Sequence, residues 1–136
     1  MNEQQTEKQS GKEWYTLRSK PHKEKGLYGE LISRGIETFY PQLKVNPVNP
    51  RARKWVPYFP GYMFVHIDLE ETGIRPMNRI PHSIGLVMFD DHVPAVPETL
   101  LRKIDHKLHE IAEAGGETFF DLEQGIRIDS WWRTLQ

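Results

Sequence analysis

The sequence predicts an α+β fold, an α/β sandwich with a mostly antiparallel four-stranded sheet flanked by helices. Three observations lead to this prediction. Stretches that alternate between apolar and polar residues are typical of strands, and four of them occur along the chain. Two other stretches have apolar residues at helical spacing, and a third, shorter one lies between strands. The chain has 136 residues, of which 38% are hydrophobic, enough for one core.

The first strand is predicted from Trp14 to Ser19, where apolar and polar residues alternate. A helix follows, opened by Ser19 or Pro21 and ended by Gly35, with the cation Arg34 in its last turn. The helical stripe consists of Leu27, Tyr28, Leu31 and Ile32.

The second predicted strand runs over residues 36–45 and is interrupted by Pro41, so we expect an edge strand or a bent strand. Residues 46–54 contain two prolines and several cations, and they predict a loop or hairpin tip. The third strand is expected to become regular after Pro60.

Residues 70–80 predict a short helix or turn region around Pro76. The fourth strand begins near Ser83 and leads to a tight turn at Asp90-Asp91. Pro97 suits the first position of a last helix, which should extend to about Glu113 and end at two glycines. Its apolar stripe consists of Leu100, Leu101, Ile104, Leu108 and Ile111.

Composition restricts the class of protein. There is no cysteine, which excludes disulfides and thiolate sites and suits a reducing, cytoplasmic location. No run of 18 apolar residues exists, so we expect no membrane span. The polar residues 1–13 predict a disordered leader, residues 14–114 the folded domain, and residues 115–136 a linker with a last extended piece.

The net charge of −1 conceals an uneven distribution. Nine Lys or Arg and three Glu residues lie between Trp14 and Lys54, an excess of six positive charges. Between Glu98 and Glu123 the acids exceed the cations by four. Such a chain is able to face nucleic acid with one side and protein with another, although solvated surface is an equally good explanation of any single charge.

The sequence contains no constellation typical of an enzyme, and we expect no catalytic residue, no metal, no cofactor and no small-molecule substrate. His106 and His109 have a spacing that is able to hold a metal, but no obvious third ligand follows except a nearby glutamate. Asp90 and Asp91 are neighbours at a turn and would point apart, so turn chemistry explains them better than a carboxylate pair.

The most informative stretch is FPGYMFVHI, residues 59–67. Its two faces differ, because side chains alternate across a strand. One face is aliphatic and suits a core under helices, and it carries Met63, Val65 and Ile67. The other is amphipathic, and it carries Tyr62, Phe64 and His66. The amphipathic face is either a binding surface or a second core, and the sequence leaves both open.

The same stretch partly matches the strand with which RNA-recognition domains stack bases, K/R-G-F/Y-G/A-F-V-x-F/Y. It differs where Pro60 replaces the cation, Met63 the small residue and Ile67 the last aromatic residue. A single-stranded RNA-binding module that uses Tyr62 and Phe64 is therefore the alternative function.

Taken together, three motifs resemble the N-terminal (NGN) domain of NusG-type transcription elongation and antitermination factors. They are Trp14-Tyr15 before a helix, then Phe59-Pro60-Gly61-Tyr62-Met63-Phe64-Val65, and then Val93-Pro94-Ala95-Val96-Pro97 before an amphipathic helix. The resemblance covers residues 14–114. It implies an NGN-type fold and a domain that catalyses nothing.

The resemblance also implies a partner, the clamp helices of the largest subunit of RNA polymerase, and an effect on processivity and pausing. It implies a hydrophobic binding pocket formed by Phe59, Pro60, Tyr62, Phe64, Leu101 and Ile104. Aromatic anchors of this kind carry most of the energy when a helical tip docks into an apolar groove.

Two further expectations follow from the resemblance. Contacts with non-template DNA would involve Lys20, His22, Lys23 and Arg79. Residues 115–136 resemble, around Phe120 and Gly125-Ile126, the opening of a truncated barrel of the KOW type.

Overall fold

A computed structural model describes residues 11–46, 51 and 54–118. The predicted barrel opening around Phe120 and most of the predicted leader lie outside these residues. The described residues form two compact units. The first unit takes in residues 11–40 and 61–100, and the second takes in the described residues of 41–60 and of 101–118.

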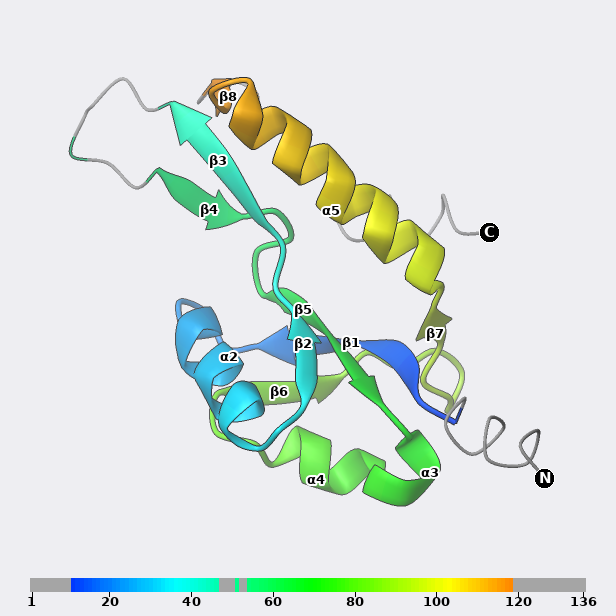
Figure 1. Ribbon diagram of the computed structural model, residues 1–136. Coiled ribbons are helices and arrows are strands. Elements are labelled where there is room, and N and C mark those ends of the chain that lie inside the picture. The colour runs from blue at the N-terminus through cyan, green and yellow to red at the C-terminus, as the bar shows by residue number, and fades with distance from the viewer. Residues whose placement is uncertain (1–10, 47–50, 52–53, 119–136) are drawn as a thin grey trace. The chain divides into compact units, whose positions relative to one another are not determined.

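The first unit is built on an antiparallel sheet in the strand order β2-β5-β1-β6 (Figure 1). The central strands are β1, Glu13–Ser19, and β5, Tyr62–Ile67. The outer strands are β2, Glu37–Phe39, and β6, Ser83–Leu86. This confirms the predicted α+β fold and its antiparallel sheet. A fifth strand, β7, Ala95–Val96, pairs with the N-terminal half of β1.

Three helices belong to the first unit: α2, Glu24–Ser33; α3, Leu69–Thr72; and α4, Ile74–Asn78. One side of β1 and β5 packs against them and forms the core. The buried core residues are Tyr15, Leu17, Leu27, Leu31, Met63, Val65, Ile67, Met77, Ile80 and Leu86.

Helix α2 begins later than the sequence predicts. Ser19 remains in β1, and residues 20–23 form a turn in which the amide of Lys23 donates to the carbonyl of Lys20 at 3.1 Å. The predicted end at Gly35 is confirmed. Gly35 has φ 74°, and the amides of Gly35 and Ile36 donate back to the last turn of the helix, which satisfies its carbonyls.

The predicted strand over residues 36–45 is in fact two strands. β2 belongs to the sheet of the first unit, whereas β3, Gln42–Asn46, pairs with a strand of the second unit. Pro41 lies between the two and has no amide hydrogen for a ladder, which is the physical reason for the break.

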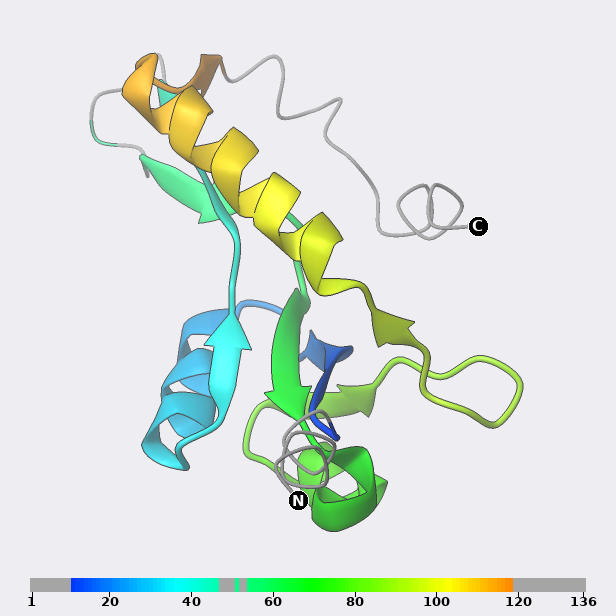
Figure 2. The same cartoon turned by 45° about the vertical axis from the view of Figure 1, so that its right-hand side comes forward.

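In the second unit β3 pairs antiparallel with β4, Trp55–Pro57, and parallel with β8, Glu117–Thr118. Helix α5, Glu98–Glu113, lies along this hairpin in both ribbon views (Figures 1 and 2). Its apolar stripe packs on the strands, in a cluster of Leu43, Val45, Val56, Tyr58, Ile104, Leu108 and Ile111. Gly115 and Gly116 end α5 with positive φ, as predicted.

The tight turn at Asp90-Asp91 is also confirmed. Phe89 and His92 exchange two backbone hydrogen bonds of 2.8 and 2.9 Å, and the two aspartates between them have φ 46° and 66°. Positive φ at both central residues is the pattern of a type I′ hairpin turn. No helix among the described residues is long and apolar enough to cross a membrane.

Candidate functional site

The two faces of β5 differ as the sequence predicts. Met63, Val65 and Ile67 are buried in the core beneath the helices. The other face carries Tyr62, Phe64 and His66, which lie opposite three residues of β1 across the antiparallel ladder. The cross-strand pairs are Arg18 with Tyr62, Thr16 with Phe64, and Trp14 with His66.

Burial divides this second face. Phe64 is fully buried, and its ring centroid lies 6.1 Å from that of Phe39 on the neighbouring strand β2. Tyr62, at the start of β5, is only partly buried. Phe64 is therefore a core residue in this structure, whereas Tyr62 presents part of its ring to solvent.

Gly61 holds the chain at the entry to β5. Its carbonyl accepts from the amide of Ser19 at 2.8 Å, and its own amide donates to Oε2 of Glu24, in the first turn of α2, at 3.2 Å. Its φ of 85° lies in the region that glycine tolerates best. These bonds set the position of Tyr62 relative to β1 and α2.

The remaining predicted pocket residues belong to the second unit. Phe59 is buried, with its ring edge-on to Tyr58 at a centroid distance of 4.9 Å. Leu101 is buried on α5, Ile104 is half-buried, and Pro60 is exposed. Of the six predicted pocket residues, Pro60, Tyr62 and Ile104 are accessible to a partner.

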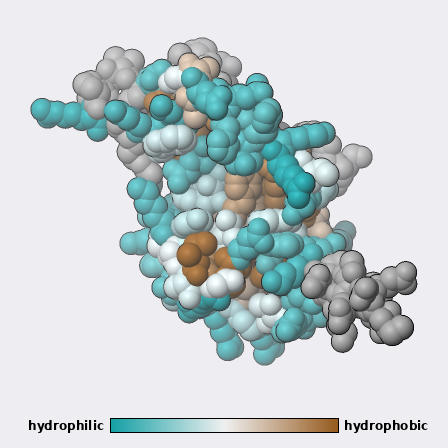
Figure 3. Space-filling model, viewed as in Figure 1, coloured by the Kyte–Doolittle hydropathy of each residue, from teal (hydrophilic) through white to brown (hydrophobic). Residues whose placement is uncertain are grey.

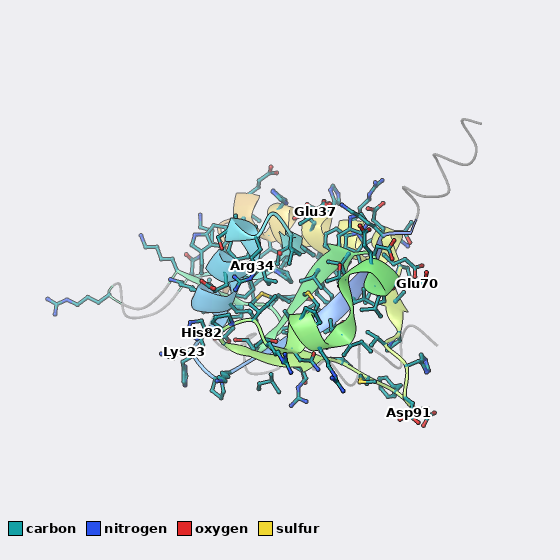
Figure 4. All side chains as sticks on the ribbon, turned by 90° about the horizontal axis from the view of Figure 1, so that it is seen from below. Lys23, Arg34, Glu37, Glu70, His82 and Asp91 are labelled. Carbon is teal, nitrogen blue, oxygen red and sulfur yellow. The ribbon has the colours of Figure 1, made fainter. Side chains whose placement is uncertain are left out.

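The residues predicted to contact DNA are all exposed. Lys20, His22 and Lys23 form the turn between β1 and α2. The amide of Lys20 donates to the carbonyl of His82 at 2.9 Å, which brings this turn next to the segment that follows Arg79. Figure 4 shows Lys23 and His82 together at one end, and Glu70 and Asp91 at the other.

Sequence reasoning counted Arg18 among the cations but did not assign it to a site. The structure places it directly opposite Tyr62, with an exposed side chain, close in the chain to the turn of Lys20. Alternation along the strand already puts the side chain of Arg18 on the same face of β1 as Trp14 and Thr16. Only the register of β1 on β5 shows that Arg18 is paired with the aromatic residue Tyr62.

A second aromatic arrangement lies at the opposite end of the same face. The rings of Trp14 and His66 stack at 4.8 Å, and the indole Nε1 of Trp14 donates to Oε1 of Glu98 at 3.2 Å. Nδ1 of His66 lies 2.9 Å from Oε1 of Glu37. An open groove of about 390 Å³ adjoins them, lined by Lys12, Glu13, Trp14, His66, Ala95, Val96, Pro97 and Glu98.

On the helix-covered side a larger groove of about 780 Å³ runs beside α3 and α4, with Tyr15 in its wall. The phenol of Tyr15 donates to Oε2 of Glu13 at 3.3 Å. Burial raises the pKa of Tyr15, and the negative charges of Glu13, Asp68 and Glu70 raise it further. This groove is therefore acidic along one wall.

The histidine pair on α5 is occupied by local contacts. Nε2 of His106 lies 2.9 Å from Oε1 of Glu110, and Nδ1 of His109 lies 2.8 Å from the carbonyl oxygen of Asp105. That carbonyl, followed by the carboxylate of Asp105, raises the pKa of His109. Within the described part of the chain no three His, Asp or Glu residues form a group suited to a metal.

A model of the NusG family, described as transcription termination factor nusG, matches residues 12–105. The chain belongs to the NusG family. A solved structure of NusG from Thermotoga maritima, whose subject is domain interaction, is similar, with a TM-score of 0.51 and 19% sequence identity. The likeness covers 68% of this chain and 55% of that chain, and at this identity it shows the fold alone. No curated protein matches.

The NusG match includes every residue expected to contact polymerase or DNA, from Lys20 to Ile104. It begins just before β1 and ends within α5, so it takes in residues of both units. NusG proteins are transcription factors, which agrees with the resemblance drawn from the three sequence motifs. This chain spans about half the length of the Thermotoga maritima NusG chain.

Proposed function

We propose that this chain is a transcription elongation and antitermination factor domain that binds RNA polymerase, promotes processive elongation and modulates pausing. The observation that carries the proposal is the match of residues 12–105 to the NusG family. At the start of β5 the exposed Pro60 is followed two positions later by the partly exposed Tyr62, and such residues suit contact with a protein partner.

The proposed contact is with the clamp helices of the polymerase's largest subunit. Pro60, Tyr62 and Ile104 have accessible surface and would touch the partner directly. Phe59, Phe64 and Leu101 are buried and have almost no surface to offer a partner.

Two variants test this contact in a pull-down with a clamp-helix fragment. Tyr62→Ala and Ile104→Ala should each weaken binding by roughly 30-fold, the effect of losing an anchor worth about 2 kcal/mol. The melting temperature of Tyr62→Ala should stay close to that of the wild type, because its side chain is only partly buried. That of Ile104→Ala should fall, because Ile104 also packs in the cluster around α5.

Tyr28→Ala is the matched control, since the Tyr28 ring is 38% exposed on α2 and is not among the predicted contact residues. The face that Figure 3 shows is mostly hydrophilic, with small hydrophobic patches. The Tyr28→Ala variant should bind the fragment normally. Normal binding by both Tyr62→Ala and Ile104→Ala would refute the assignment of the contact residues.

The alternative is a single-stranded RNA-binding module that stacks bases on Tyr62 and Phe64. Arg18 opposite Tyr62 supplies the cation that Pro60 does not. Phe64, however, is fully buried, and a buried ring offers no face for a base. The alternative thus requires a rearrangement that polymerase binding does not.

We further propose that the exposed cations Lys20, Lys23 and Arg79, together with His22, contact the non-template DNA strand of the transcribing complex. Lys20, His22 and Lys23 share one turn just after Arg18, and a backbone hydrogen bond joins this turn to His82, three residues after Arg79, which supports the proposal. Lys23→Gln and Arg79→Gln should reduce cross-linking to non-template DNA, while binding to the clamp-helix fragment is unchanged. Unchanged cross-linking in the double variant would argue against this DNA contact.

A further inference from the structure

The hairpin of β3 and β4 has one face on α5 and one face away from it. Leu43 and Val56 are opposite each other and belong to the cluster around α5. The next pair along the ladder, Lys44 and Trp55, lies on the other face because side chains alternate along each strand. A cation and an indole ring are therefore direct cross-strand neighbours on the outward face.

Trp55 is unusually accessible for its size, with 47% of its surface exposed. The cluster around α5 takes in Val56 and Tyr58 from the same segment but leaves this indole out. The exposed part of the indole is available to stack on a flat ligand.

Within residues 41–60 the charges have one sign. The segment from Pro41 to Pro60 contains no Asp or Glu, and its cations are Lys44, Arg51, Arg53 and Lys54. Lys54 adjoins Trp55, and its carbonyl accepts from the amide of Val45 at 2.8 Å, which closes the end of the ladder. Within the described part of the chain neither Lys44 nor Lys54 takes part in an ion pair.

We propose that this outward hairpin face binds single-stranded nucleic acid, with the indole of Trp55 stacked on an unpaired base and Lys44 at an adjacent phosphate. A base in a duplex is already stacked on both sides, so an isolated exposed ring favours an unpaired base. A lysine that takes part in no ion pair among the described residues is available to a phosphate. One ring and several cations predict binding that depends on salt and tolerates sequence.

This site is separate from the residues proposed above. Trp55 and its lysines belong to the second unit, whereas Lys20, His22, Lys23 and Arg79 belong to the first. None of the predicted polymerase contacts lies on the outward face of the hairpin. The two binding activities are therefore open to separate tests.

The test is fluorescence anisotropy of the full chain with labelled oligo-dT and oligo-U of about 12 nucleotides, a length within the usual range of single-strand sites. Trp55→Ala should weaken binding by about 5- to 150-fold, the range for losing one stacked base. Trp55→Phe, which keeps a flat ring, should lose less. Lys44→Gln should lower the slope of log K against log salt by about 0.7.

Phe89→Ala is the matched control, because Phe89 is also 47% exposed but adjoins Asp90 in the first unit. It should bind oligonucleotide as the wild type does, and so should Tyr62→Ala. Tighter binding of oligo-U identifies RNA as the ligand, tighter binding of oligo-dT identifies DNA, and either supports the site. The proposal is overturned by no binding at low salt, by equal binding of a duplex, or by wild-type affinity in Trp55→Ala.

Discussion

At the scale of single residues, Gly85 and Gly29 show how differently two glycines can be placed. Gly85 has φ 132°, and a Cβ added there would lie 2.8 Å from Oδ1 of Asn78. That oxygen cannot easily move, because it accepts from the amide of Leu86 at 3.0 Å. Gly29 lies inside α2, and a Cβ added there would meet nothing within 4 Å. Only the first position needs glycine.

We therefore expect Gly85→Ala and Gly29→Ala to have opposite effects. Gly85→Ala should lower the free energy of unfolding by about 1–3 kcal/mol, through backbone strain and the displaced Asn78. Gly29→Ala should raise it by about 0.5–1 kcal/mol, because alanine has the higher helix propensity. Urea unfolding of both variants measures this, and a stabilised Gly85→Ala would contradict the described backbone of β6 and its close approach to Asn78.

Tyr15 makes the stability depend on pH. Burial raises its pKa above the ordinary value of 10.0, so the folded state favours the neutral phenol. This stabilisation is complete below pH 10.0 and is lost as the pH rises through the pKa of the folded state. Between pH 10.0 and the pKa of the folded state, the free energy of unfolding of the wild type should therefore fall. The Tyr15→Phe variant has no phenol to ionise at this position and should not show this fall.

The measurement is the free energy of unfolding of wild type and Tyr15→Phe as the pH is raised above neutrality. Above pH 10.0 the free energy of unfolding of the wild type should fall relative to that of Tyr15→Phe. Tyr28→Phe, at an exposed ring on α2, controls for the loss of one phenol. A difference that stays constant with pH would show that Tyr15 has the same pKa in the folded and unfolded chain.

At the scale of elements, the hairpin turn between β6 and β7 has a backbone that Asp tolerates and that glycine would suit better. Asp90 and Asp91 both have positive φ, at 46° and 66°. The left-handed region costs an ordinary residue roughly 1–2 kcal/mol, and Asp tolerates it better than most but less well than Gly. Asp-Gly is among the preferred pairs for a type I′ turn.

Asp91→Gly should therefore raise the free energy of unfolding by about 0.5–1 kcal/mol. Asp91→Ala should lower it, because alanine has neither the short polar side chain of Asp nor the freedom of Gly. Thermal melts of the two variants against the wild type decide this. Equal melting temperatures for both would mean that the turn does not hold this backbone in solution.

The helices show the same contrast between local signals and packing. The start of α2 is set by tertiary contacts, since Lys20 is bonded to His82 and Glu24 to Gly61, and local signals placed it too early. The ends of α2 and α5 are set by glycines, and both were predicted correctly. A glycine that ends a helix acts through its own backbone, so the local sequence is enough to predict it. The start of α2 has no side-chain cap, so the local sequence does not mark it.

At the scale of the whole molecule, the proposed partners differ in chemistry and should differ in their response to salt. The polymerase contact rests on apolar side chains such as Tyr62 and Ile104, while the nucleic-acid contacts rest on cations. Because binding to nucleic acid releases counterions, its affinity falls steeply as the ionic strength rises. The affinity of a contact that rests on apolar burial does not.

Raising NaCl from about 50 mM to about 200 mM should thus reduce oligonucleotide binding strongly and change clamp-helix binding little. Parallel anisotropy titrations with labelled oligo-dT and with a labelled clamp-helix fragment measure both. If the two affinities fell in parallel, the polymerase contact would be electrostatic, and the proposed apolar anchors would be wrong.

The sequence by itself determined the class of fold, the two faces of β5, the Asp90-Asp91 turn, the ends of two helices and the family. These features depend on periodicity, on turn residues and on a motif, all of which are local in the chain. Division of residues 36–45 into two strands was signalled by Pro41, but the sequence did not show that the halves join different sheets.

Only the tertiary structure decided which aromatic residues are accessible. Phe59, Phe64, Tyr62 and Trp55 lie close together in the sequence, yet the first two are buried, Tyr62 is partly exposed, and Trp55 is 47% exposed. The register of β1 on β5 placed Arg18 opposite Tyr62, and that of β3 on β4 placed Lys44 opposite Trp55. Exposure and cross-strand pairing depend on segments distant in the chain, so no local pattern encodes them.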